Sequence, residues 1–172
     1  MKYVGEGSVL ISSIQNFDDL ASRTTPEDLV KFLNQHLDVQ LGVVEEFSGS
    51  VVQFAGSRII AYWTSEQTKE HSQLAFSSAR KMLSVAEPSV EYCVVVSSGR
   101  MVADLFGGGD WIQFQIFGEA MDIANRLLKY PIDSHKALLT SKKTVQGFGN
   151  SELKVSLVGT ANGTLEVYSV SI

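Results

Sequence analysis

The feature that most constrains the fold is an alternation between β-rich apolar runs and long helical patterns. One amphipathic pattern starts at Thr25 and Pro26, a cap residue followed by a residue suited to the first helical turn, and ends at Gly49. A second covers residues 65–85 and stops before Pro88. Because β-rich runs lie before, between and after these patterns, the chain predicts an α+β fold with mostly antiparallel strands backed by helices.

Turn signals separate the β-rich runs and set their order. A further helix is predicted after Gly118, through Leu128. The order strand, helix, strand, strand, helix, strand is that of a ferredoxin-like sandwich, a βαββαβ core, here with a C-terminal extension. With three prolines and no linker or internal repeat, residues 1–172 are predicted to form a single domain. The expected strands are residues 8–14, 50–54, 58–63, 91–98, 101–106, 111–117, 137–140, 153–157 and 164–170.

Composition and charge exclude several classes of protein. Hydrophobic residues make up 44% of the chain and charged residues 19%, which favours a packed core over disorder. A net charge of −5 gives no general attraction for nucleic acid or anionic membrane. No apolar stretch is long enough to span a bilayer, and the first residues lack a signal core, so we expect a cytoplasmic protein without direct membrane insertion. A domain cut from a larger membrane receptor would look the same.

Some residues that often carry chemistry have structural explanations here. Cys93 lies in an apolar run and is expected to be a buried, inert thiol. His36, His71 and His135 fall on separate elements without metal-ligand spacing. The glycines at 107–109 are not followed by the residues of a phosphate-binding loop, so they predict a hairpin tip.

Five segments, in order along the chain, resemble the catalytic domains of class III adenylate and guanylate cyclases. They are residues 9–17, 26–34, 53–57, 98–103 and 117–127. The resemblance covers essentially the whole chain. It implies the ferredoxin-like sandwich of this family and a head-to-tail dimer whose active sites are shared between protomers.

The resemblance also places the family's two metal-binding aspartates, and both are replaced. They fall at Ser13 and Ser57. Mg²⁺ and Mn²⁺ prefer anionic oxygen ligands, so two neutral hydroxyls remove most of the attraction for a divalent ion. Asp18 and Asp19 are close in sequence but are expected to cap and solvate a short helix. No cofactor is therefore expected, and Mg²⁺ or Mn²⁺ would be needed only if the domain were an enzyme.

The positions that read the base and hold the phosphates depart from the family as well. The lysine and aspartate that recognise adenine fall at Gln53 and Gln115, whose amides could hydrogen-bond a purine edge or simply face water or a dimer interface. The lysine that holds the terminal phosphates falls near Asn162, which the turn with Gly163 explains without a ligand.

One catalytic position of the family is retained. Arg126 matches the transition-state arginine and could clamp a phosphate, but it could equally pair with Asp122 or Glu119 on the same helix. Asp122 stands where the family has its transition-state asparagine. An acid there has the wrong sign to stabilise developing negative charge. We interpret Arg126 as a remnant of the catalytic network.

These replacements favour a catalytically degenerate cyclase-like domain that acts in signalling as a regulatory or dimerisation module. The expected partner is a second copy or another cyclase-type domain, with residues 51–63 and 114–117 offering aromatic surface for the interface. One alternative is an active or partner-complemented cyclase that makes a cyclic nucleotide from ATP or GTP. Another is a non-catalytic sensor that binds a nucleotide or another small ligand in the vacated cleft.

Overall fold

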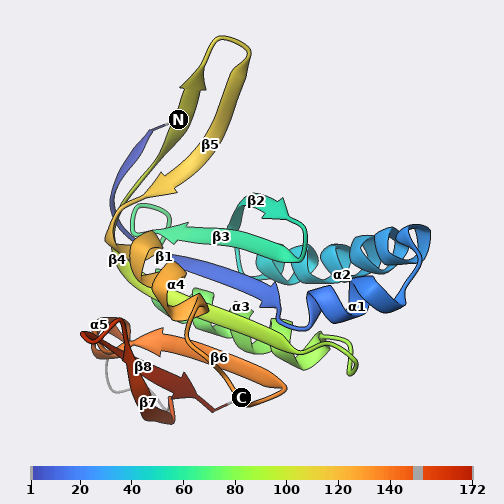
Figure 1. The fold of residues 1–172 in the computed structure, drawn as a ribbon. Helices are drawn as coiled ribbons and strands as arrows, with labels where there is room; N and C mark the ends of the chain where they lie inside the picture. Colours follow the sequence, from blue (N-terminus) through green and yellow to red (C-terminus); the bar gives the residue numbers. More distant parts are fainter. Residues whose placement is uncertain (1, 149–152, 172) are drawn as a thin grey trace.

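The computed structural model describes residues 2–148 and 153–171 of the chain (Figure 1). It confirms the α+β fold, with one eight-stranded sheet and its helices. The elements are β1 (Tyr3–Ile14), α1 (Phe17–Arg23), α2 (Pro26–Glu46), β2 (Ser50–Ala55), β3 (Arg58–Thr64), α3 (His71–Val85), β4 (Tyr92–Gly108), β5 (Trp111–Phe117), α4 (Glu119–Leu128), β6 (Lys136–Ser141), α5 (Lys142–Gly147), β7 (Val155–Ala161) and β8 (Leu165–Val170).

The sheet carries a hydrophobic core on each face. Its strands lie in the order β2-β3-β1-β4-β6-β8-β7, and β5 pairs with the outer part of β4. β1 is antiparallel to both β3 and β4, whereas β4 and β6 are parallel. Side chains alternate along β1, so Leu10 joins the cluster with α2 and α3 while Val9 and Ile11 join the cluster with α4. This alternation determines which residues of β1 face the α4 side of the sheet.

Both ends of α2 are explained by particular contacts. The Thr25 hydroxyl accepts a hydrogen bond from the backbone N–H of Asp28 at 3.2 Å, which caps the helix where the sequence predicts. At the other end Ser48, with φ of 59°, takes the left-handed conformation. Gly49 is required for a different reason: a Cβ there would lie 2.5 Å from the ring of Trp63. The predicted stop is therefore present, but Gly49 serves close packing.

Several predicted boundaries are wrong, and one helix was missed. Residues 91–98 and 101–106, predicted as two strands, belong to the single strand β4. Gly99 does not break it, because that glycine accommodates the side chain of Glu119, whose Oε2 would lie 2.8 Å from an added Cβ. The second long helix begins at His71 instead of residue 65, because Thr64 and Gln67 form a hydrogen-bonded turn. Helix α5 was not predicted.

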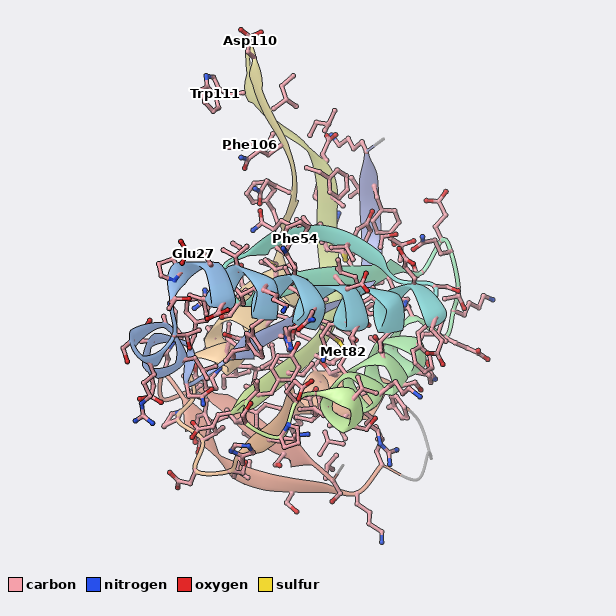
Figure 2. All side chains as sticks on the ribbon, turned by 90° about the vertical axis from the view of Figure 1, so that its right-hand side faces the viewer. Glu27, Phe54, Met82, Phe106, Asp110 and Trp111 are labelled. Atoms are coloured by element: carbon pink, nitrogen blue, oxygen red, sulfur yellow. The ribbon has the colours of Figure 1, made fainter. Side chains whose placement is uncertain are left out.

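The outer part of β4 and β5 form a hairpin that projects from the body of the molecule (Figure 1). We call residues 104–115 the arm. The predicted glycine-rich tip is confirmed, with Gly109 in the left-handed region at φ of 61°. The arm exposes large apolar side chains, and Figure 2 shows Phe106 and Trp111 on it, away from the helices. It is the most apolar exposed segment described.

Within the described ranges, no helix combines the length and apolar character needed to cross a bilayer.

Candidate functional site

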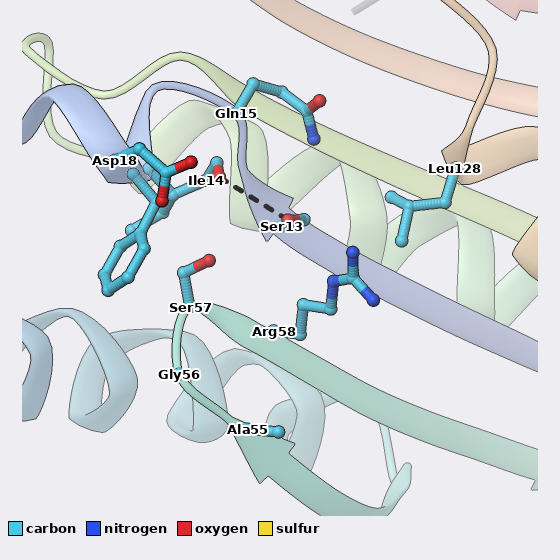
Figure 3. A pocket seen from close by; sticks show the side chains of 10 residues that line it. Ser13, Ile14, Gln15, Asp18, Ala55, Gly56, Ser57, Arg58 and Leu128 are labelled. Carbon is cyan, nitrogen blue, oxygen red and sulfur yellow. Dashed lines mark hydrogen bonds between the residues drawn. The ribbon is translucent and has the colours of Figure 1, made fainter.

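A pocket of about 350 Å³ lies where β1 ends and the β2–β3 turn passes beside it (Figure 3). Ser13 lines it from β1 and Ser57 from the turn. The two positions predicted from the cyclase resemblance, far apart in sequence, are thus brought together in one cavity. Phe17 and Asp18 close one side of the pocket, and Leu128 at the end of α4 closes another.

The strand register positions these side chains. Ser13 pairs with Arg58 across the antiparallel β1–β3 ladder, and on its other side with Cys93 of β4. Ser13 and Ser57 are only 6% and 8% exposed, so each has little freedom to move. The Ser13 hydroxyl donates only a long hydrogen bond, 3.5 Å, to the carbonyl of Ile14. The turn before β3 is made possible by Gly56, whose φ of 58° suits glycine.

The residues of this pocket do not fit a divalent metal ion. Two hydroxyls stand where hard cations need anionic oxygens, and Asp18 is the one carboxylate lining the pocket among the described residues. Arg58 brings a positive charge to the same lining. In the described part of the chain, no group of three or more His, Cys, Asp or Glu side chains is placed to hold a metal.

Arg58 was not among the site residues predicted from the sequence. Its signal was nevertheless present, since it directly follows Ser57 at the start of an expected strand. Pairing that strand with the first one places residue 58 opposite Ser13, but the register is known only from the structure. The pocket therefore differs from the expected one by the addition of a cation as well as by the absence of two acids.

Gln53 and Gln115 do not line this pocket. They lie on β2 and β5, which contact each other, and Tyr62 of β3 stacks on Phe114 of β5 with ring centroids 5.8 Å apart. Gln115 donates a hydrogen bond to Gln113 at 3.2 Å. Both glutamines are half-buried on this aromatic edge, which leaves their role in base recognition a prediction.

Arg126 is held by the last hairpin. Its Nη2 donates to the Thr164 hydroxyl at 3.2 Å and to the carbonyl of Ala161 at 3.5 Å. Asn162 and Gly163 form the turn between these two residues, with φ of 50° and 75°, as the turn interpretation predicts. The structure thus brings the Arg126 and Asn162 positions together, but neither lines the Ser13 pocket.

The alternative pairing of Arg126 on its own helix is not found among the described residues. Glu119 instead pairs with Lys143 of α5. That contact lowers the pKa of the Glu119 carboxyl, mainly through the hydrogen bond from Lys143. Asp122 is exposed in the first turn of α4, where an acid is favoured by the helix dipole. The helix dipole therefore explains an acid at position 122 without any role in substrate binding.

Cys93 and His36 are buried, and neither shows features of a reactive site. Cys93 is 1% exposed, which confirms that it is buried, and burial raises the pKa of its thiol to about 12, which disfavours the reactive thiolate. His36 is 4% exposed, and its ring packs edge-on against Tyr92 at 5.1 Å. Burial lowers the pKa of this imidazole, so it is neutral near pH 7.

Comparison with known proteins identifies the family. The family model of the adenylate and guanylate cyclase catalytic domain matches residues 1–161. This chain belongs to that family. Adenylate cyclase 1 of Rhizobium meliloti is 23% identical to it, over 96% of this chain and 27% of the relative. An adenylate cyclase of Mycobacterium tuberculosis is 27% identical, over 71% of this chain and 29% of the relative. The cyclase domain thus spans less than a third of these curated relatives.

Solved structures of cyclase domains share its fold. The adenylyl cyclase CyaB from P. aeruginosa has a TM-score of 0.86 at 18% identity, covering 100% of this chain and 96% of that one. The guanylate cyclase domain of RhGC from Catenaria anguillulae, solved in complex with GTP, has a TM-score of 0.85 at 18% identity, covering 99% and 98%. A dimeric guanylyl cyclase domain from Blastocladiella emersonii has a TM-score of 0.83 at 17% identity, covering 99% and 97%. At these identities the likeness establishes the fold of the cyclase domain.

Proposed function

We propose that this cyclase-family domain does not catalyse cyclisation and acts in signalling as a regulatory or dimerisation module. The single observation that carries the proposal is the lining of the pocket at the end of β1. Ser13 and Ser57 meet there with Asp18 as the one carboxylate among the described lining residues, and Arg58 stands beside them.

The charge of the pocket lining disfavours catalysis by divalent ions. Two-metal chemistry needs carboxylates that hold both ions and neutralise a triphosphate. Here two hydroxyls and a guanidinium occupy the same lining, so a divalent ion loses its ligands and is repelled by Arg58. Asp18 remains, but one carboxylate cannot replace a bridging pair. The chemistry of the lining side chains alone thus disfavours a divalent ion.

The retained arginine gives limited support for catalysis. Arg126 is hydrogen-bonded to Thr164 and Ala161, so part of its donor fork is already in use. Asp122 places negative charge on the same helix, where a developing oxyanion needs a donor or a cation. Both features favour a domain that has kept the fold and lost the reaction.

The arm supports assembly with a second cyclase-type domain, either another copy or a different chain. Trp111 is 84% exposed and Phe106 63%, and Phe54 of β2 and Phe117 of β5 extend the exposed aromatic surface. Exposed aromatic side chains gathered on one segment are typical of an interaction surface, because aromatic residues are enriched in interfaces. A dimeric cyclase domain among the solved structures has the same fold.

A direct assay tests the loss of activity. The chain is incubated with Mn²⁺ and either ATP or GTP, alone and mixed with an intact cyclase domain, and cyclic nucleotide is measured. We expect no product from the chain alone and no gain in the mixture beyond that of the intact domain. The intact domain alone serves as the positive control. Cyclic product from the chain alone would overturn the proposal, and extra product in the mixture would establish the partner-complemented enzyme instead.

A further inference from the structure

We propose that the pocket at the end of β1 has changed from a cation site into a binding site for a small oxyanion that needs no metal. Arg58 supplies the charge, and the hydroxyls of Ser13 and Ser57 supply further donors. The ligand would be a phosphate or carboxylate group on a small molecule. The inference rests on the proposed function only in that no divalent ion occupies the pocket.

Strand register places the guanidinium beside the serine. Ser13 and Arg58 are directly opposed in the antiparallel β1–β3 ladder. Directly opposed residues project from the same face of a sheet, with Cβ atoms about 4.5–5.5 Å apart. Figure 3 shows the Arg58 side chain extending along the pocket next to Ser13 and Leu128. The strand pairing thus fixes the backbone of Arg58, and its guanidinium reaches the cavity.

The guanidinium of Arg58 is free to bind. Among the described residues it makes no ion pair and no side-chain hydrogen bond, whereas Arg23 pairs with Asp19 and Arg126 bonds Thr164. A guanidinium carries five N–H donors in a planar fork that matches the oxygens of a carboxylate or phosphate. Arg58 is exposed, so its guanidinium differs from one that is held in a buried ion pair.

The two hydroxyls add donors on the floor of the pocket. Ser13 makes only its 3.5 Å bond to the Ile14 carbonyl, and Ser57 has no hydrogen-bond partner in the described part of the chain. A hydroxyl is a weak ligand for a divalent cation but a good donor to an anionic oxygen. The same substitution that disfavours a metal therefore favours an oxyanion. A cavity of about 350 Å³ accommodates one such group and a small body attached to it.

Asp18 opposes this binding and so provides an internal test. Its carboxylate lines the pocket, and Figure 3 shows it across the two serines from the Arg58 head group. No ion pair joins Asp18 to Arg58 among the described residues, so the acid does not neutralise the cation by direct contact. An anion bound at Arg58 would be repelled by Asp18 through the cavity, which predicts opposite effects of neutralising the two residues.

Calorimetric titration in EDTA measures the binding without metals. Pyrophosphate probes the phosphate source and succinate the carboxylate source, at low ionic strength. We expect the wild-type chain to bind at least one of them, Arg58→Gln to bind about tenfold or more weakly, and Asp18→Asn to bind several-fold more tightly. Arg80→Gln, which removes an equal charge from the exposed face of α3, is the matched control and should bind as the wild type does.

Each remaining outcome counts against the oxyanion site. No heat with either probe at millimolar concentration, equal binding by Arg58→Gln, or binding only when Mg²⁺ replaces EDTA would overturn it. The double variant Ser13→Asp/Ser57→Asp provides a second check, since it should lose oxyanion binding and gain Mn²⁺ binding. The outcome is separable from that of the cyclase assay. Cyclic product from a chain that binds pyrophosphate in EDTA would overturn the proposed function and leave the metal-free binding itself established, whereas the absence of both product and binding would overturn only this inference.

Discussion

The two halves of strand β4 both carry large apolar side chains, but these lie in opposite environments. Its inner half, residues 92–97, runs between the two core clusters and is buried throughout. Its outer half reaches the arm, where Leu105 and Phe106 are 58% and 63% exposed. Helices cover residues 92–97 on both faces, and no described helix covers the part of β4 beyond Ala103 (Figure 1). Apolar sequence therefore favours burial, but the covering layers decide whether burial occurs within one chain. The exposed Leu105 and Phe106 would be covered by the partner that we propose.

The largest effect on stability is expected from the buried part of the strand, which on the α4 side extends to Met101. Met101 is fully buried on the α4 side of the sheet. Met101→Ala removes buried atoms and leaves a cavity, so we expect the free energy of unfolding to fall by about 2–5 kcal/mol. Urea unfolding measures this change. A loss below about 1 kcal/mol would show that β4 is packed no more tightly at Met101 than in the exposed arm.

The arm should show its effect in association instead of folding. Trp111→Ala removes the most exposed aromatic side chain of the arm, and we expect the dimer to weaken by about 2 kcal/mol, or roughly 30-fold. Sedimentation equilibrium over a range of concentrations measures the dissociation constant. Val30→Ala, an exposed apolar residue of α2, is the control and should leave association unchanged. A wild-type chain that is a strict monomer at every concentration would break the proposed role of the arm.

A pH dependence is expected on the inner side alone. His36 packs against Tyr92, the first residue of β4, and burial lowers its pKa below the ordinary 6.5. In the unfolded chain His36 keeps the ordinary pKa, so near pH 6.5 the unfolded chain binds more protons than the folded one. The free energy of unfolding should therefore fall as the pH drops through about 6.5, by about 1 kcal/mol for each unit by which burial lowers the pKa. Urea unfolding between about pH 7.5 and pH 5 measures this slope. His36→Phe should reduce the slope without abolishing it, because burial also lowers the pKa of His71. An unchanged slope would show that His36 is not the source.

The smallest effect is expected at Leu105, four residues beyond Met101 on the same strand. Its side chain is largely in water, so Leu105→Ala should change the free energy of unfolding by less than about 0.5 kcal/mol at concentrations where the chain is monomeric. Measured with Met101→Ala under identical conditions, it forms a matched pair. Equal losses in the two variants would mean that the arm is folded against something within the monomer.

Local patterns predicted most of the fold, because they are set by neighbours in the chain. The cap at Thr25 and the turn at Asn162 follow from short-range chemistry and are present as predicted. Gly99 misled the prediction because its role is to let the distant Glu119 side chain approach β4, which no local pattern shows. The start of α3 was missed for a similar reason, since the Thr64–Gln67 turn competes with helix over a few residues.

The candidate site was predicted only in part. The resemblance to cyclases singled out Ser13 and Ser57, and the structure places both in the lining of one pocket, while their lost role as metal positions stays a prediction. Arg58 was missed because its meaning depends on the β1–β3 register, a property of two strands far apart in the sequence. The partner of Arg126 was missed likewise, since Thr164 approaches it only through the fold of the C-terminal hairpin.

Strand β4 passes from core to arm as one uninterrupted element, and this has a mechanical consequence. Its backbone pairs with β1 from Tyr92 to Ala103 and with β5 from Val102 to Gly108, so the two ladders overlap and leave no hinge between them. A displacement of the tip by a bound partner would be transmitted along β4 to β1, as far as the position where Cys93 pairs with Ser13. Partner binding at the arm and ligand binding in the Ser13 pocket would therefore both act on strand β4. A proline near Asp104, which would interrupt the β4–β5 pairing, would uncouple the two binding events.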